Sequence, residues 1–83
     1  MINYHKTDRD RRKAGLVYMG ALRGNNRAIV LGCMLAPHLV NNVERSEVFM
    51  TAMRDNKDID GIRLYSALER TWELCYNSMN GRN

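Results

Sequence analysis

The sequence predicts an all-α fold, a small single-domain bundle of about four helices. In the longest periodic segment, residues 60–79, apolar residues recur at steps of three and four, which is the spacing of one helical face. The apolar set includes six Met and one Phe, and unbranched side chains favour helices over sheets. The 83 residues suffice for one domain with a modest core. We therefore treat 1–83 as a single helical domain and expect residues 1–6 and 80–83 to fray.

The first helix is predicted to run from Asp8 to about Arg23, with Thr7 as its N-cap. Its apolar face follows the helical spacing i, i+3, i+4, i+7 and consists of Ala14, Val17, Tyr18 and Ala21. Gly15 and Gly20 interrupt this segment, and each costs about 1 kcal/mol relative to Ala in a helix. Either these glycines let a neighbouring helix approach closely, or they argue against a helix here.

A turn is predicted at residues 24–26, where Gly-Asn-Asn follows the first helix and Asn26 can cap the next one. The second helix then covers Arg27 to Ala36. Because this segment is almost wholly apolar, we expect a central element that is buried on most sides. Pro37 disfavours helical geometry in the residue before it, so the helix ends near Ala36 or kinks there.

A β-hairpin is the alternative interpretation of residues 16–35, and it would make the fold α+β. Residues 16–22 and 28–35 flank the turn as two strands of a hairpin would. Few of these residues are β-branched, however, and neither run alternates cleanly between apolar and polar side chains. Leu, Met and Ala dominate both runs, so the helical interpretation is preferred.

Two further helices are predicted in the second half of the chain. Asn42 or Ser46 caps the third helix, which runs to about Arg54 and has Val48, Phe49, Ala52 and Met53 as its apolar face. Asp60 caps the fourth helix, and Asn80-Gly81 ends it. The apolar stripe of this helix consists of Ile62, Tyr65, Leu68, Trp72, Cys75, Tyr76 and Met79. We expect the shorter helices to pack against it.

No residue pattern in the sequence points to catalysis, a metal or a cofactor. Cys33 and Cys75 lie far apart outside any C-x-x-C pair, which predicts two reduced, half-buried thiols and no disulfide framework. His5 and His38 lack the spacing of a zinc site. Asp55 begins an acidic loop, but the Gly and Glu that a calcium loop requires are missing. We expect a protein that is not an enzyme and uses no cofactor.

The apolar runs in the sequence are short. The longest uncharged apolar run, residues 28–36, has nine residues, whereas a membrane-spanning helix needs about 20. No secretory signal pattern is visible. The sequence therefore predicts a cytoplasmic protein with no membrane partner.

Positive charge is concentrated in the first third of the chain. Residues 1–30 hold seven basic and two acidic residues, a net charge of +5, and residues 31–83 hold six basic and seven acidic residues, a net charge of −1. On a helix beginning at Asp8, Arg9, Arg12 and Lys13 share one face, while Arg11 points elsewhere. The candidate binding residues are Lys6, Arg9, Arg12, Lys13, Arg23 and Arg27. Such asymmetry predicts an anionic partner for this end of the chain.

Three hypotheses for function follow from these observations. In the first, a small binding module engages nucleic acid, or a complex that handles nucleic acid, through phosphate contacts of the basic N-terminal third. In the second, a stoichiometric inhibitor or adaptor, of the kind carried by phages and other mobile elements, binds an acidic protein surface. In the third, the chain is a homo-oligomer that buries its apolar surface against a second subunit.

Overall fold

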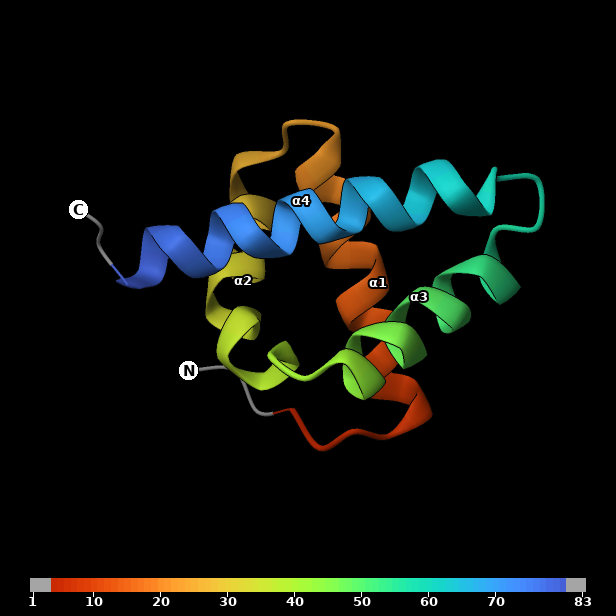
Figure 1. Ribbon diagram of the computed structural model, residues 1–83, viewed down its shortest axis with the longest axis horizontal. Coiled ribbons are helices and arrows are strands. Elements are labelled where there is room, and N and C mark those ends of the chain that lie inside the picture. Colours follow the sequence, from red (N-terminus) through yellow and green to blue (C-terminus); the bar gives the residue numbers. More distant parts are fainter. Residues whose placement is uncertain (1–3, 81–83) are drawn as a thin grey trace.

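Figure 1 shows the computed structural model of this protein, which describes residues 4–80, with side chains described as far as residue 77. The elements in chain order are α1 (Asp8–Leu22), α2 (Asn26–Leu35), the short 3-10 helix η1 (Ala36–Leu39), α3 (Asn42–Asp55) and α4 (Gly61–Asn80). Residues 4–80 contain no strand. The predicted all-α bundle of four helices is confirmed. Fraying is expected at residues 1–6 and 80–83, and of these, positions 1–3 and 81–83 lie outside the described residues.

Polar side chains fix where each α-helix begins. The caps accept hydrogen bonds from backbone N–H groups of the first turn, and they are Thr7, Asn25, Asn41 and Asp60. Thr7 and Asp60 are the predicted caps of α1 and α4. The caps predicted for α2 and α3, Asn26 and Asn42, are each one residue too late. Asn25 and Asn41 have the extended backbone that a cap requires, and the residue after each is already helical.

The alternative hairpin at residues 16–35 is wrong. Residues 16–22 complete α1, and residues 28–35 belong to α2. Between them Gly24 has φ 84°, a conformation that glycine adopts without strain and that ends a helix. The N-cap at Asn25 then starts a new helix at once, so the chain has no room for strand pairing across this turn.

The four helices form an orthogonal arrangement. In Figure 1, α1 and α2 run side by side in opposite directions, α4 crosses both, and α3 lies against the N-terminal half of α1. The core between them is organised around Trp72 of α4 and Tyr18 of α1, whose rings meet edge to face with centroids 5.6 Å apart. The Tyr18 hydroxyl donates a hydrogen bond to the Gly32 carbonyl of α2, at 2.7 Å. The shorter helices do contact α4, but the most extensive packing in the bundle is that of α1 against α2 and α3.

The apolar stripe of α4 differs from the predicted one at its first turn. Ile62 is 82% exposed, and the unpredicted Leu64 is buried instead. Leu68, Trp72 and Cys75 are buried as expected. Leu64 lies four residues before Leu68 and so on the same face, whereas Ile62 lies six residues before it, about 120° around the helix. The spacing itself therefore favours Leu64, and including Ile62 in the stripe was the error. Tyr76 is also exposed, and the Met79 side chain lies outside the described residues.

The prediction that α2 is buried on most sides is wrong. Within α2 only Gly32 and Leu35 are buried. Its outward side is apolar as well as exposed, and consists of Ile29, Val30, Leu31 and Met34. The reason is that α1 and α4 pack on one side of α2 only, and no other described element covers the remaining side. An apolar helix thus lies at the surface of the bundle.

Candidate binding groove

The six cations predicted as a binding site lie in two groups at opposite ends of α1. Lys6, Arg9, Arg12 and Lys13 lie before or within its first half, whereas Arg23 follows its last residue and Arg27 begins α2. All six side chains are exposed. The 15 residues of α1 rise about 22 Å. The structure therefore does not bring the six together into one continuous surface.

In the first group, Arg12 is the cation that forms ion pairs among the described residues. Arg12 contacts Asp8 at 3.4 Å and Asp55 at 3.8 Å, and Arg54 also binds Asp8, at 2.8 Å. The hydrogen bond from Arg54 holds the pKa of the Asp8 carboxyl below its usual range. In the described part of the chain, Lys6, Arg9 and Lys13 form no ion pair. This end of the molecule is a mixed-charge network that links α1 to α3.

Arg11, the arginine that the sequence places off this face, is held within the molecule. Its Nε lies 3.4 Å from the buried Glu44 carboxylate, and its Nη2 lies 2.9 Å from Glu47. Both carboxylates belong to α3. The sequence prediction that Arg11 points away from Arg9 and Arg12 is consistent with these contacts.

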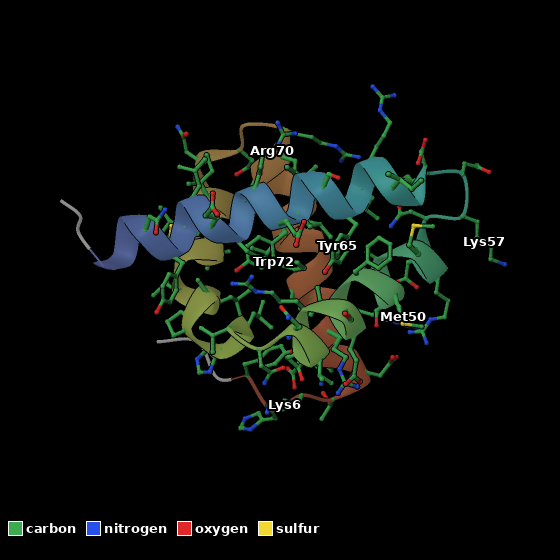
Figure 2. The ribbon with its side chains drawn as sticks, in the orientation of Figure 1. Lys6, Met50, Lys57, Tyr65, Arg70 and Trp72 are labelled. Carbon is green, nitrogen blue, oxygen red and sulfur yellow. The ribbon has the colours of Figure 1, made fainter. Side chains whose placement is uncertain are left out.

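The second group gains two arginines from α4. Arg23 and Arg63 line the same hollow of about 330 Å³ beside Leu22. Arg70 lies further along α4, on the side next to the α1–α2 turn (Figure 2). In the part of the chain that the structure describes, Arg23, Arg27, Arg63 and Arg70 form no ion pair. In this they resemble Lys6, Arg9 and Lys13 and differ from Arg12, which has carboxylate partners.

Asp60 is a carboxylate close to this group, because it lines the hollow that Arg23 and Arg63 share. Its Oδ1 accepts hydrogen bonds from the backbone N–H groups of Ile62, at 3.0 Å, and of Arg63, at 3.3 Å. Asp60 thus serves as the N-cap of α4. Glu69 and Glu73 line a separate hollow with Arg70, so three carboxylates lie near the four arginines, although none of them forms an ion pair with these arginines among the described residues.

An apolar groove of about 420 Å³ opens between α1, α2 and α4 at this same end. Its lining residues are Ala21, Leu22, Ile29, Cys33, Ala67, Arg70, Thr71, Leu74 and Cys75. Leu74 is 71% exposed, and Leu22 and Ile29 are also exposed. Beyond Ile29 the apolar outer side of α2 continues the surface. Arg70 lines the groove itself, Arg23 and Arg63 line the adjoining hollow, and Arg27 lies with Val30 and Leu31 on the outer side of α2. We call the groove together with these four arginines the arginine-flanked groove.

A larger hollow of about 850 Å³ lies elsewhere along α4, and its lining mixes both signs of charge. Its residues are Arg45, Ser66, Glu69, Arg70, Glu73, Tyr76 and Asn77. Arg45 already has structural roles, because its guanidinium lies 5.4 Å from the centre of the Trp72 ring and its Nε donates to the Leu39 carbonyl. Because two arginines and two glutamates line this hollow, it favours neither an anionic nor a cationic ligand. This hollow is a weaker candidate than the arginine-flanked groove.

Sequence reasoning found half of the arginines beside the groove and missed the rest. Arg63 and Arg70 are seven residues apart, a spacing that places both on one face of α4. That face is distinct from the apolar stripe of α4. The shared face was therefore a signal in the sequence that could have identified the two arginines as a pair. What the sequence could not show is that the face of α4 with these arginines lies beside the α1–α2 turn, because that depends on how the helices cross.

Comparisons with protein-family models, with curated proteins and with solved structures found no match for this chain. Among the described residues, no helix is long and apolar enough to cross a membrane. Within the same residues, no group of three or more His, Cys, Asp or Glu side chains could hold a metal ion. Arguments about function therefore rest on the geometry of this chain alone.

Proposed function

We propose that this protein is a non-enzymatic binding module that acts as an inhibitor or adaptor of another protein. The arginine-flanked groove receives a helical segment of the partner, which presents an apolar face with carboxylates beside it. The observation that supports this proposal is the juxtaposition of an exposed apolar groove with four arginines that make no ion pair among the described residues. Of the hypotheses drawn from the sequence, the protein-binding one fits this surface best.

The apolar part of the surface favours a protein partner. Protein interfaces have an apolar centre in which a few well-packed side chains supply most of the binding energy, within a polar rim. Leu22, Ile29 and Leu74 are exposed around one groove, an arrangement that suits the apolar face of a helix. Phosphates and sugars would gain little from such a lining, because interfaces with nucleic acid are markedly more polar.

The charged part of the surface favours a partner whose binding surface is negatively charged. Arg23, Arg63 and Arg70 lie where carboxylates at the edge of a docked helix would reach them. Arginine presents a planar fork of donors that binds a carboxylate through two hydrogen bonds. Complementary charge of this kind also steers the encounter and excludes basic partners. The partner surface that fits is therefore acidic at its rim and aliphatic at its centre.

The proposal is tested by selecting ligands from a library of displayed peptides that form helices with randomised faces. We expect the selected peptides to combine Leu or Ile at helical spacing with flanking Asp or Glu. Their affinity should fall at least about tenfold with Leu74→Asp. Ile62→Asp is the matched control, since Ile62 lies on the same helix, is 82% exposed and is outside the groove. Selection of basic peptides, or equal losses in the two variants, would contradict the proposal.

A matched pair of charge reversals tests the role of the arginines. Arg23→Glu with Arg70→Glu changes the net charge by the same amount as Arg9→Glu with Lys13→Glu. We expect the first pair to weaken peptide binding about tenfold or more, because it removes contacts at the groove, and the second pair to have a small effect. If both pairs weaken binding equally, the effect comes from long-range attraction between the net charges, and the groove is not the binding site.

Binding of nucleic acid is the second candidate function, and the unpaired state of the four arginines favours it. A net charge of +4 and exposed guanidinium groups suit phosphate contacts. Such binding should weaken steeply between about 50 mM and about 200 mM salt and should be indifferent to Leu74→Asp. Titration of duplex DNA and of single-stranded RNA against both charge-reversal pairs separates the two functions. Tight, salt-sensitive binding that Leu74→Asp leaves intact would replace the protein-binding proposal.

A further inference from the structure

The two cysteines meet at the floor of the groove, although they are far apart in the sequence. Cys33 belongs to α2 and Cys75 to α4, and both line the same groove. The Cys75 sulfur lies 4.0 Å from the Ile29 carbonyl oxygen of α2. A methyl group placed on Gly32 would be 3.4 Å from that sulfur, in van der Waals contact with it. Cys75 therefore lies directly against the backbone of α2.

Helix geometry places the Cys33 thiol beside the same carbonyl. Cys33 follows Ile29 by four residues, and side chains of a helix tilt toward its N-terminus, over the preceding turn. The Cys33 side chain therefore lies over the turn that contains the Ile29 carbonyl, where the Cys75 sulfur also lies. Cys33 is half-buried and Cys75 is only 4% exposed. The groove gives access to the first thiol and shields the second.

We propose that Cys33 and Cys75 form a modification site that a disulfide-class oxidant, such as glutathione disulfide, converts into an intramolecular disulfide joining α2 to α4. Both cysteines are free thiols in the structure, so the reduced pair predicted from the sequence is the starting state. The cross-link lies between two walls of the groove and fixes their separation. This inference does not depend on the proposed function, because it requires no partner protein.

The reaction proceeds by two successive thiol–disulfide exchanges. The Cys33 thiolate attacks one sulfur of the oxidant, which forms a mixed disulfide at Cys33 and releases one small thiolate. The Cys75 thiolate then attacks the Cys33 sulfur and releases the second. Each protein thiol gives its proton to solvent, two electrons pass to the oxidant, and the oxidant becomes two thiols. The order follows from accessibility, since the oxidant reaches Cys33 from the groove.

The second exchange should be slow at neutral pH and faster in alkali. Burial, together with the neighbouring Cys33 thiol, raises the pKa of Cys75 to about 12. Only the thiolate attacks, so below this pKa the thiolate fraction of Cys75 rises about tenfold for each unit of pH. The mixed disulfide at Cys33 should therefore accumulate briefly and then disappear as the intramolecular bond forms.

The experiment treats the folded protein with excess glutathione disulfide and follows its intact mass, its free thiols and its peptide map. We expect loss of both thiols, a final mass lower by two hydrogens, and a cross-linked fragment joining the peptides that contain Cys33 and Cys75. Because the bond closes a long loop, the Tm should rise by roughly 10 °C over the reduced protein. Cys75→Ser should stop at a stable glutathione adduct on Cys33, and Cys33→Ser should remain unmodified while folded.

Three results would overturn the proposal. One is a glutathione adduct on Cys33 of the unsubstituted protein that persists at alkaline pH, which would show that Cys75 cannot reach it. Another is a disulfide-linked dimer as the main product. The third is a protein whose thiols stay free when folded but react when the same sample is unfolded in urea. None of these three results depends on the folding of the variants, because each is measured on the unsubstituted protein.

Discussion

Glu44 is the residue that links the start of the chain to the third helix. Its buried carboxylate accepts a hydrogen bond from the Tyr4 hydroxyl and lies 3.4 Å from the Arg11 guanidinium. Its backbone N–H donates to the Asn41 side chain at the cap of α3. A carboxylate in the first turn also suits the positive end of the helix dipole. One side chain thus connects the N-terminal segment, α1 and α3.

Replacing Glu44 with Gln should lower the free energy of unfolding by about 2 kcal/mol, because two charge-assisted hydrogen bonds are weakened in a buried place. Glu47→Gln is the matched control, since Glu47 pairs with the same arginine but its side chain is 40% exposed. That change should cost less than about 1 kcal/mol. Urea denaturation measures both values. Equal costs for the two variants would show that burial of Glu44 adds nothing.

Tyr18 makes the stability of the protein sensitive to alkali. Burial raises the pKa of its hydroxyl well above the ordinary value of 10.0, so the folded protein keeps a proton that the unfolded chain loses. The free energy of unfolding should be constant below about pH 10 and should fall above it, by up to about 1.4 kcal/mol per pH unit. Burial and Glu44 raise the pKa of Tyr4 as well, which adds to this loss in the same direction.

Tyr18→Phe isolates the contribution of that hydroxyl. The variant should lose about 1 kcal/mol at neutral pH, since the Gly32 carbonyl keeps its helical hydrogen bond from Ala36. Its stability should then decline less steeply than that of the unsubstituted protein between about pH 9 and about pH 11. Urea unfolding at several pH values gives the comparison. Parallel curves for the two proteins would contradict the assignment to Tyr18.

At the scale of elements, the two glycines of α1 face different neighbours. A Cβ at Gly20 would lie 2.9 Å from the Ala28 Cβ of α2, which is too close without movement. A Cβ at Gly15 would lie 3.5 Å from the Ala52 Cβ of α3, an ordinary van der Waals contact. Gly20 therefore allows the close approach of α1 and α2, whereas Gly15 leaves room for a methyl group.

These contacts predict opposite effects for the same substitution. Gly15→Ala should raise the free energy of unfolding by up to about 1 kcal/mol, because alanine is the better helix former and its methyl group fits. Gly20→Ala should lower it by about 1 to 3 kcal/mol, because the overlap with Ala28 forces the helices apart. Thermal unfolding of both variants tests whether each substitution stabilises or destabilises the protein. A stabilising Gly20→Ala would show that the α1–α2 contact is looser than described.

The helices themselves could be predicted because their signals are local. Cap residues, the Gly-Asn-Asn turn and the apolar spacing all act over a few neighbouring positions, and they place the four helices within a residue or two. The side of a helix that neighbouring helices cover depends on contacts between distant parts of the chain, so local signals do not predict it. An apolar α2 is compatible with full burial, and the crossing of the helices leaves one side of it exposed. Ile62 is a different case, because it lies about 120° around α4 from Leu68 and the spacing alone already favours Leu64.

At the scale of the whole molecule, the excess charge of the first 30 residues does not translate into one basic surface. Carboxylates of α3, Glu44, Glu47 and Asp55, contact Arg11 and Arg12 near the start of α1. Each of these pairs joins residues more than 30 positions apart, as 33 positions separate Arg11 from Glu44. Composition alone therefore located a basic segment but could not show which of its cations have carboxylate partners.

The most direct test of the binding account is a map of where a ligand contacts the protein. Protein labelled with ¹⁵N is titrated with a peptide selected from the helical library, and the amide signals are followed by NMR. The account predicts that the largest shifts fall on Leu22, Ile29, Arg70 and Leu74, around the arginine-flanked groove. Shifts concentrated on Arg9 to Lys13, or spread evenly over the surface, would contradict it.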